Sequence, residues 1–175
     1  PLTLAKPAVA HVNSGTVNVS AGDLVLTLAG AGGSFTNTGA LVLSAGRTIT
    51  VSGGEFRHES GSLGAAGTLV FNTGAVAHLI APFTLTALSV SGSVLHLTPP
   101  LSTSSLSFTA SGSTIHGPGT LTHSSGLTLT LPGCTLNLPL VNEGTLVLSG
   151  SGAVNGAFTS LPGSTLRILG TDVHG

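Results

Sequence analysis

Asn37-Thr-Gly-Ala-Leu-Val-Leu43 is the stretch that decides the fold, because it joins a corner sequence to a short strand sequence. Asn can hydrogen-bond its own turn backbone, and Gly can adopt the positive φ that a tight corner needs. The apolar run that follows is typical of a short β-strand. The same cassette recurs as Asn13-Ser-Gly-Thr-Val-Asn-Val19 and as Asn142-Glu-Gly-Thr-Leu-Val-Leu148. The chain is therefore predicted to be a repeat protein.

Nine glycines precede such apolar runs, and we take them as the anchors of the repeat: Gly15, Gly39, Gly61, Gly74, Gly92, Gly112, Gly126, Gly144 and Gly163. Their spacing ranges from 13 to 24 residues, and each of the two shortest gaps follows a longer one, which indicates displaced anchors within some turns. Four anchors have Asn two positions upstream, and Glu59 and Ser124 stand in the same position before two others. These Asn and Gly residues are predicted to form structural corners: Asn13, Gly15, Asn37, Gly39, Asn72, Gly74, Asn142 and Gly144.

An apolar residue stands three to five positions before the anchors, and this recurrence predicts one inward column: Phe35, Phe56, Phe71, Leu88, Phe108, Leu121, Leu140 and Phe158. A unit this short cannot bury a hydrophobic face alone, so neighbouring units must stack. No stretch keeps the 3.6-residue apolar period of an α-helix. The fold class is therefore predicted to be all-β, a parallel β-helix or β-solenoid of about eight coils.

The whole chain, residues 1–175, is predicted to form a single solenoid domain, with residues 1–12 as an N-terminal extension or cap strand and residues 171–175 as a tail. The alternative is an antiparallel sandwich of short strands. A sandwich explains the alternation of apolar and polar residues but not the recurring Asn-x-Gly corner.

Charged side chains are scarce, at 5% of the 175 residues, where an ordinary soluble domain has about 25%. The net charge of −1 and the absence of a basic cluster argue against nucleic-acid binding. No apolar run reaches the roughly 18 residues of a membrane span. The single cysteine, Cys134, has no partner for an internal disulfide and is expected to be buried as a small hydrophobic residue.

The stretch Phe35-Thr-Asn-Thr-Gly-Ala-Leu-Val-Leu-Ser-Ala-Gly46, echoed in residues 141–150, resembles the degenerate repeats of bacterial surface β-helices. Those proteins include autotransporter passengers and filamentous-haemagglutinin-like adhesins. The resemblance covers nearly the whole chain and is carried by the spacing of Gly, Asn and Leu. It implies a right-handed coil, secretion to the cell surface or the extracellular space, and an adhesive or structural role, and it identifies no site.

Three histidines, His78, His96 and His116, each lie four residues after an anchor glycine, so they would stack on the outer surface of a solenoid. Imidazoles about 5 Å apart would share a divalent metal or act as a pH switch, and the alternative is a solvated polar column. We expect no Cys or carboxylate in the neighbouring positions to complete a metal set. The prediction is therefore no metal and no cofactor, with this histidine ladder kept as a candidate.

The segment Glu55-Phe-Arg-His-Glu59 holds four ionisable residues in five positions, with Glu55, Arg57 and Glu59 expected on the outer face. A glycosidase pair of carboxylates is the functional alternative. Four residues of strand separate the two carboxylates by about 13 Å, beyond the roughly 5–9.5 Å of known hydrolases. A cross-strand salt-bridged patch is therefore predicted, and no catalytic residue.

These features predict a non-enzymatic structural protein, a subunit or segment of an extracellular filament or surface fibre, that associates with itself. The open ends of a solenoid expose unpaired backbone, and neither end of the sequence has an amphipathic helix or a charged cap. The alternative is an adhesin passenger module that binds glycans or a host surface. More remote alternatives are a carbohydrate-active β-helix enzyme and an ice-binding protein. For the latter, Thr-x-Thr pairs occur at irregular offsets from the anchors: Thr48/Thr50, Thr84/Thr86, Thr120/Thr122 and Thr128/Thr130.

Overall fold

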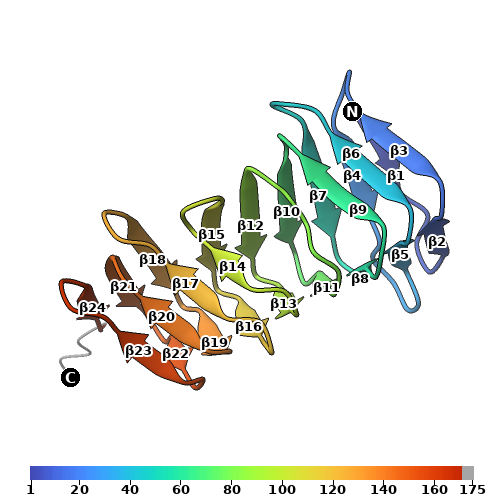
Figure 1. The fold of residues 1–175 in the computed structure, drawn as a ribbon. Helices are drawn as coiled ribbons and strands as arrows, with labels where there is room; N and C mark the ends of the chain where they lie inside the picture. The colour runs from blue at the N-terminus through green and yellow to red at the C-terminus, as the bar shows by residue number, and fades with distance from the viewer. Residues whose placement is uncertain (171–175) are drawn as a thin grey trace.

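The computed structural model describes residues 1–170, which form a rod of stacked β-coils that runs from the N-terminal to the C-terminal end (Figure 1). Every ladder between neighbouring coils is parallel, and the longest sheet has eight strands, one from each coil. No helix occurs in these residues. The predicted all-β parallel solenoid of about eight coils is confirmed, while the predicted tail, residues 171–175, lies outside the described residues.

The first face of the rod consists of nine strands in two hydrogen-bonded sheets. They are β1 (Leu2–Leu4), β4 (Leu24–Thr27), β7 (Thr48–Ser52), β10 (Thr68–Asn72), β12 (Ala87–Ser91), β15 (Ser107–Ser111), β18 (Thr128–Pro132), β21 (Thr145–Ser149) and β24 (Thr165–Leu169). The two sheets meet where β15 and β18 contact one another without forming a ladder. From β7 onward every strand on this face has five residues, so the face has a constant width.

The second face is one continuous sheet. Its strands are β2 (Ala10–Asn13), β5 (Ser34–Asn37), β8 (Glu55–His58), β11 (Val76–Leu79), β13 (Val94–Leu97), β16 (Thr114–His116), β19 (Thr135–Asn137) and β22 (Ala153–Val154). The segment predicted as an extension, residues 1–12, contains β1 and most of β2, which pair with β4 and β5 as part of the first coil.

The third face is interrupted halfway along the rod. One sheet contains β3 (Thr16–Val19), β6 (Ala40–Leu43) and β9 (Ser62–Ala65), and the other contains β14 (Leu101–Ser102), β17 (Leu121–His123), β20 (Leu140–Asn142) and β23 (Phe158–Ser160). Between β9 and β14 the fourth coil has only a single bridge, from Gly64 to Thr84. This interruption opens the side of the rod at the fourth and fifth coils.

The core is a set of inward columns, because alternate side chains of each strand point to opposite sides of the sheet. On the first face, Leu24, Ile49, Leu69 and Leu88 occupy successive rungs of one column, and all four are buried. Full burial of such a side chain stabilises the fold by roughly 1.5–3 kcal/mol relative to exposure. The stack is therefore stabilised mainly by contacts between each coil and its neighbours.

The prediction of one inward column is wrong, because the apolar residues belong to three different faces. Phe35 and Phe56 stack on the second face with ring centroids 5.8 Å apart, whereas Phe71 lies on the first face and Leu140 on the third. Phe56 also contacts Phe71 across the core, at a centroid distance of 5.4 Å. The sequence pattern is the same on all three faces because each face begins with a corner and continues with a strand.

The anchor glycines likewise divide among the three corners, three to each. Gly15, Gly39 and Gly61 lie between the second and third faces, Gly74, Gly92 and Gly112 between the first and second, and Gly126, Gly144 and Gly163 between the third and first. The two short gaps, from Gly61 to Gly74 and from Gly112 to Gly126, fall where the anchor moves to another corner. The irregular spacing therefore arises because the anchor glycine lies at a different corner of the coil after each short gap.

Two different physical demands select glycine at these corners. Gly74 has a φ of +75°, which favours glycine over any residue with a Cβ. Gly39 is not in that conformation, and a Cβ there would collide with the backbone oxygen of Gly15 in the coil before. Glycine is therefore required at position 39 because successive coils approach closely there, and not because of the positive φ that the sequence led us to expect.

Candidate functional site

The ionisable side chains of the described residues concentrate on the outer side of the second face. Glu55 and Arg57 lie on β8, and the histidine ladder, His78, His96 and His116, continues over β11, β13 and β16. The ladder pairs place the three histidines on successive rungs, directly after Arg57. Within residues 1–170 this column is the only place where several titratable side chains stack.

The three imidazole rings are stacked and nearly parallel. The centroids of His78 and His96 are 4.5 Å apart with 2° between the ring planes, and those of His96 and His116 are 4.8 Å apart with 12°. The far end of the ladder meets Asn137, whose Nδ2 lies 3.4 Å from Nδ1 of His116. Each ring is held by the coil spacing, because its backbone is part of a parallel ladder.

A carboxylate group borders the ladder, contrary to the prediction. Oε1 of Glu55 lies 3.1 Å from Nε2 of His78, and the same oxygen accepts a 2.9 Å hydrogen bond from Arg57. Arg57 also donates to Glu59 at 2.8 Å. The predicted salt-bridged patch thus has its Arg–Glu pairs along one chain segment, and only the contact to His78 crosses between strands.

The ladder does not converge on one point. The lone pair of each ring nitrogen lies in the plane of its ring, so parallel rings direct their lone pairs side by side. Among residues 1–170 no group of three or more His, Cys, Asp and Glu side chains is placed to hold a metal ion. Stacked in this way, the three imidazoles do not form a chelating set.

Proton binding to the ladder is opposed by its surroundings. Partial burial lowers the pKa of His96, and the neighbouring imidazoles of His78 and His116 lower it further. Partial burial also lowers the pKa of His78, with a second contribution from Arg57 and an opposing one from Glu55. Each added proton would place like charges within about 5 Å of one another, which disfavours the charged form.

We expect the stability of the protein to fall as the pH decreases below about 6.5. The folded pKa values of His78 and His96 lie below the unfolded value near 6.5, so the unfolded chain binds more protons in this range. The free energy of unfolding, measured by urea denaturation from pH 7.5 to pH 5, should therefore decrease. A His96→Gln variant should show a smaller decrease.

A control variant and a second buried histidine help to interpret this experiment. Thr114→Ser, an outward change on the same face, should leave the pH dependence unchanged. His58 is also buried, and burial lowers its pKa, so a residual pH dependence should remain in His96→Gln. Equal pH dependence in His96→Gln and the unaltered protein would contradict a role for the ladder.

A second polar column is buried at the corner between the second and third faces. Asn13 Nδ2 donates to Asn37 Oδ1 at 2.7 Å, and Asn37 Nδ2 lies 3.1 Å from Nδ1 of His58. Nε2 of His58 lies 3.1 Å from the Pro82 carbonyl oxygen. Because the amide group donates to Nδ1, the proton of His58 is on Nε2, where it satisfies that carbonyl. The column is a neutral hydrogen-bonded chain through four coils.

A similar buried position lies at the corner between the third and first faces. Nε2 of His123 lies 3.0 Å from the carbonyl oxygen of Leu127, and Nδ1 lies 3.2 Å from the hydroxyl of Thr103. Asn142 occupies the same rung position in the next coil and donates to the Thr165 carbonyl at 3.0 Å. These residues satisfy the backbone where the chain turns.

The prediction that Glu59 and Ser124 take the asparagine position is wrong, because His58 and His123 occupy those rungs. Asn37 pairs with His58, and Asn142 pairs with His123. The sequence does contain a signal, since each of these four residues stands two positions after an inward apolar residue. Counting two positions forward from the inward apolar residue identifies both histidines. Counting two positions back from the anchor glycine identifies Glu59 and Ser124 instead, because these two corners have one more residue than the others.

The other predicted corner residues also lie at turns, but their side chains bond mostly to other coils. Asn13 donates to the Ala40 carbonyl of the next coil at 2.9 Å, and Asn72 accepts a 2.6 Å hydrogen bond from Ser52 of the coil before. Asn37 in addition reaches its own turn, at the carbonyl oxygen of Gly39.

Cys134 is buried, as predicted. Burial raises the pKa of its thiol, which disfavours the thiolate form that acts as a nucleophile. The residue therefore behaves as a small hydrophobic side chain of the core.

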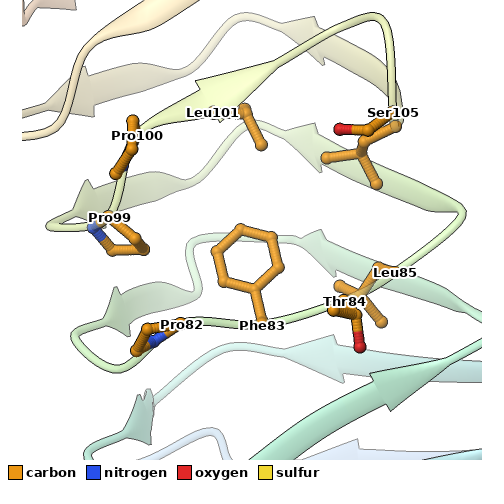
Figure 2. Close-up of a pocket in the computed structure, with 9 residues that line it drawn as sticks. Pro82, Phe83, Thr84, Leu85, Pro99, Pro100, Leu101 and Ser105 are labelled. Atoms are coloured by element: carbon orange, nitrogen blue, oxygen red, sulfur yellow. The ribbon is translucent and has the colours of Figure 1, made fainter.

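A cleft of about 440 Å³ lies at the interruption of the third face (Figure 2). Pro82 and Phe83 from the fourth coil face Pro99 and Pro100 from the fifth. Proline has no amide proton, so the three prolines cannot donate to a ladder between the two coils. The lining is uncharged and mainly apolar, and its side-chain hydroxyl groups come from a threonine and a serine at the edge, Thr84 and Ser105.

No protein-family model, no curated protein and no solved structure matches this chain. The structure shows the β-solenoid repeat that the resemblance implied, and the autotransporter or adhesin family remains a prediction. No helix in residues 1–170 is long and apolar enough to cross a membrane.

Proposed function

We propose that this chain is a non-enzymatic structural protein, a subunit or segment of an extracellular filament or surface fibre built from stacked coils. The observation that supports the proposal is the exposure of core columns at both ends of the described rod. Leu166 and Ile168 on β24 continue the columns of Leu146 and Leu148 but are 39% and 73% exposed. At the other end, Leu2 continues the column of Leu24 and is 66% exposed.

The two ends are complementary in form. Each presents strands on the same three faces, with the last strands β22, β23 and β24 at one end and the first strands β1, β2 and β3 at the other. Open strand edges pair readily with further strands, and the inward columns would become buried by the same contact. Stacking of one rod on another therefore repeats the contact that already joins neighbouring coils.

The low charge of the chain is consistent with such packing. Side-by-side or end-to-end contact removes water from both surfaces, and desolvating ionised groups is unfavourable unless they are paired. With 5% charged residues, most of this surface avoids that penalty. Mechanical rigidity would come from the parallel backbone ladders between coils.

Ile168→Lys should block end-to-end association. The lysine would place a charge in the exposed column at the C-terminal end of the described rod, where a stacking coil would have to bury it. The unaltered protein should form elongated assemblies at neutral pH, visible by electron microscopy and by sedimentation. The variant should remain at the size of a single rod.

Thr165→Lys provides the matched control, because it adds the same charge on the same strand but pairs with Thr145 on the outward side. It should still assemble. A protein that remains monomeric at all accessible concentrations would contradict the filament proposal.

A second candidate function, an adhesin module that binds glycans or a host surface, is favoured by the cleft at the fourth and fifth coils. Phe83 presents an aromatic ring to the cleft and Ser105 a hydroxyl group at its edge, a combination suited to the apolar faces and the hydroxyl groups of a sugar. Glycan binding by a monomeric protein, lost in Phe83→Ala, would favour this function over the filament.

A further inference from the structure

The outward side of the first face carries an ordered array of small uncharged side chains over β7, β10, β12 and β15. One column runs through successive rungs as Thr48, Thr68, Ala87 and Ser107. Two residues further along each strand, a parallel column runs as Thr50, Val70, Ser89 and Thr109. Neighbouring strands lie about 4.8 Å apart and alternate residues of a strand about 6.7 Å apart, so the array repeats in two directions.

The hydroxyl groups of this array are free to bind an external partner. None of those in the two columns hydrogen-bonds to another protein group within residues 1–170. No ionisable side chain belongs to the array, whereas the second face carries Glu55, Arg57 and the histidine ladder. The four strands also share one length, which keeps the array regular at its edges.

We propose that this array is an ice-binding surface. The strand-to-strand repeat is close to the oxygen repeat along one axis of a prism face of hexagonal ice, and the repeat along the strand is somewhat shorter than the oxygen repeat along the other axis. Hydroxyl groups at that spacing can hold ordered water by hydrogen bonds, and the methyl groups of Thr, Val and Ala order the water between them. Charged side chains would bind water in orientations that ice does not allow, and the array has none.

The rigidity of the backbone adds to this fit. Binding to a solid lattice requires many weak contacts to form at once, and each mobile side chain would lose conformational entropy. Here the strands are fixed by backbone ladders to their neighbours, and Thr and Val are stiff at χ1. The surface is therefore ordered before ice contacts it.

The array is hard to find in the sequence because the anchor glycines change corner. Thr48/Thr50 and Thr128/Thr130 both lie on the first face, on β7 and β18. Thr84 and Thr122 lie on the third face and do not belong to the array. In the coils between β7 and β18 many of the same positions hold Val, Ala or Ser in place of Thr, so a search for Thr-x-Thr alone finds scattered pairs.

The test measures thermal hysteresis and inhibition of ice recrystallisation by the purified 175-residue chain. Both activities should exceed those of serum albumin at equal concentration. Thr50→Tyr and Thr109→Tyr each place a bulky ring in the array, and each should remove most of the activity. Thr114→Tyr is the matched control, because it makes the same change in the same coil as Thr109 but on β16 of the second face. It should retain full activity, and circular dichroism melting curves should be equal for all variants compared.

Three results would overturn the proposal. One is activity no greater than that of albumin, and another is an equal loss in Thr114→Tyr. The third is binding to crystalline cellulose or chitin, with no effect on ice, that is lost in Thr109→Tyr, which would assign the array to a solid polysaccharide. Ile168→Lys separates this inference from the filament proposal, since a rod that no longer assembles should still bind ice.

Discussion

Replacing Phe56 with alanine should lower the free energy of unfolding by about 3–5 kcal/mol. The side chain is fully buried, stacks on Phe35 in the coil before and contacts Phe71 on the adjacent face. Removing the ring leaves a cavity that neighbouring coils cannot close, because their spacing is set by backbone ladders. Urea denaturation followed by circular dichroism at pH 7.5 measures the change.

Arg57→Ala is the matched control for this prediction. Arg57 is the next residue on the same strand, it points outward, and its ion pairs to Glu55 and Glu59 are partly exposed. Exposed ion pairs contribute about 0–1 kcal/mol, so this variant should lose little stability. Comparable losses in the two variants would show that the stacked aromatic core is not what holds these coils together.

Replacing Gly39 with alanine should lower the free energy of unfolding by about 3 kcal/mol or more. A Cβ at this position would collide with the backbone oxygen of Gly15, and backbone atoms cannot move aside as a flexible side chain can. Relief would require the first and second coils to separate at this corner. That separation would weaken the hydrogen bonds from Gly39 N to Asn13 O and from Ala40 N to Gly15 O.

Gly15 supplies the control for Gly39, since it occupies the same corner one coil earlier and a Cβ added there would meet no atom within 4 Å. Gly15→Ala should therefore change the free energy of unfolding by less than about 1 kcal/mol. Both measurements use the same denaturation assay. Equal losses at Gly15 and Gly39 would exclude close coil approach as the reason for glycine at position 39.

The architecture is predictable because the Asn-x-Gly corner and the alternating strand recur together and leave few ways to bury the apolar side chains. The corner at which each glycine lies is not predictable from the sequence. Gly39 and Gly74 both follow an Asn-x-Gly pattern, yet they lie at different corners of the coil. Local sequence determines that the chain turns, but only the pairing of coils determines which turn lies above which. This pairing depends on contacts between residues about 20 positions apart, as between His78 and His96.

The histidine ladder is accessible from the sequence because a constant offset from glycine holds within the three coils in which the anchors share a corner. The contact between Glu55 and His78 cannot be found from the sequence in this way. It depends on the pairing of β8 with β11, and the anchor glycines next to these two strands lie at different corners. Buried His58 is hidden for a related reason, because its corner has one more residue than that of Asn37. The cleft beside Phe83 reflects a missing strand, which no positive signal in the sequence marks.

The interruptions of the first and third faces have a mechanical consequence. The third face lacks a ladder between the fourth and fifth coils, and the first face lacks one between the sixth and seventh. Between the fourth and fifth coils, the other two faces keep their ladders, β10 with β12 and β11 with β13. Between the sixth and seventh coils, the remaining ladders are β16 with β19 and β17 with β20. Under tension or bending the rod should flex like a hinge at these two levels, in different directions, before any coil detaches.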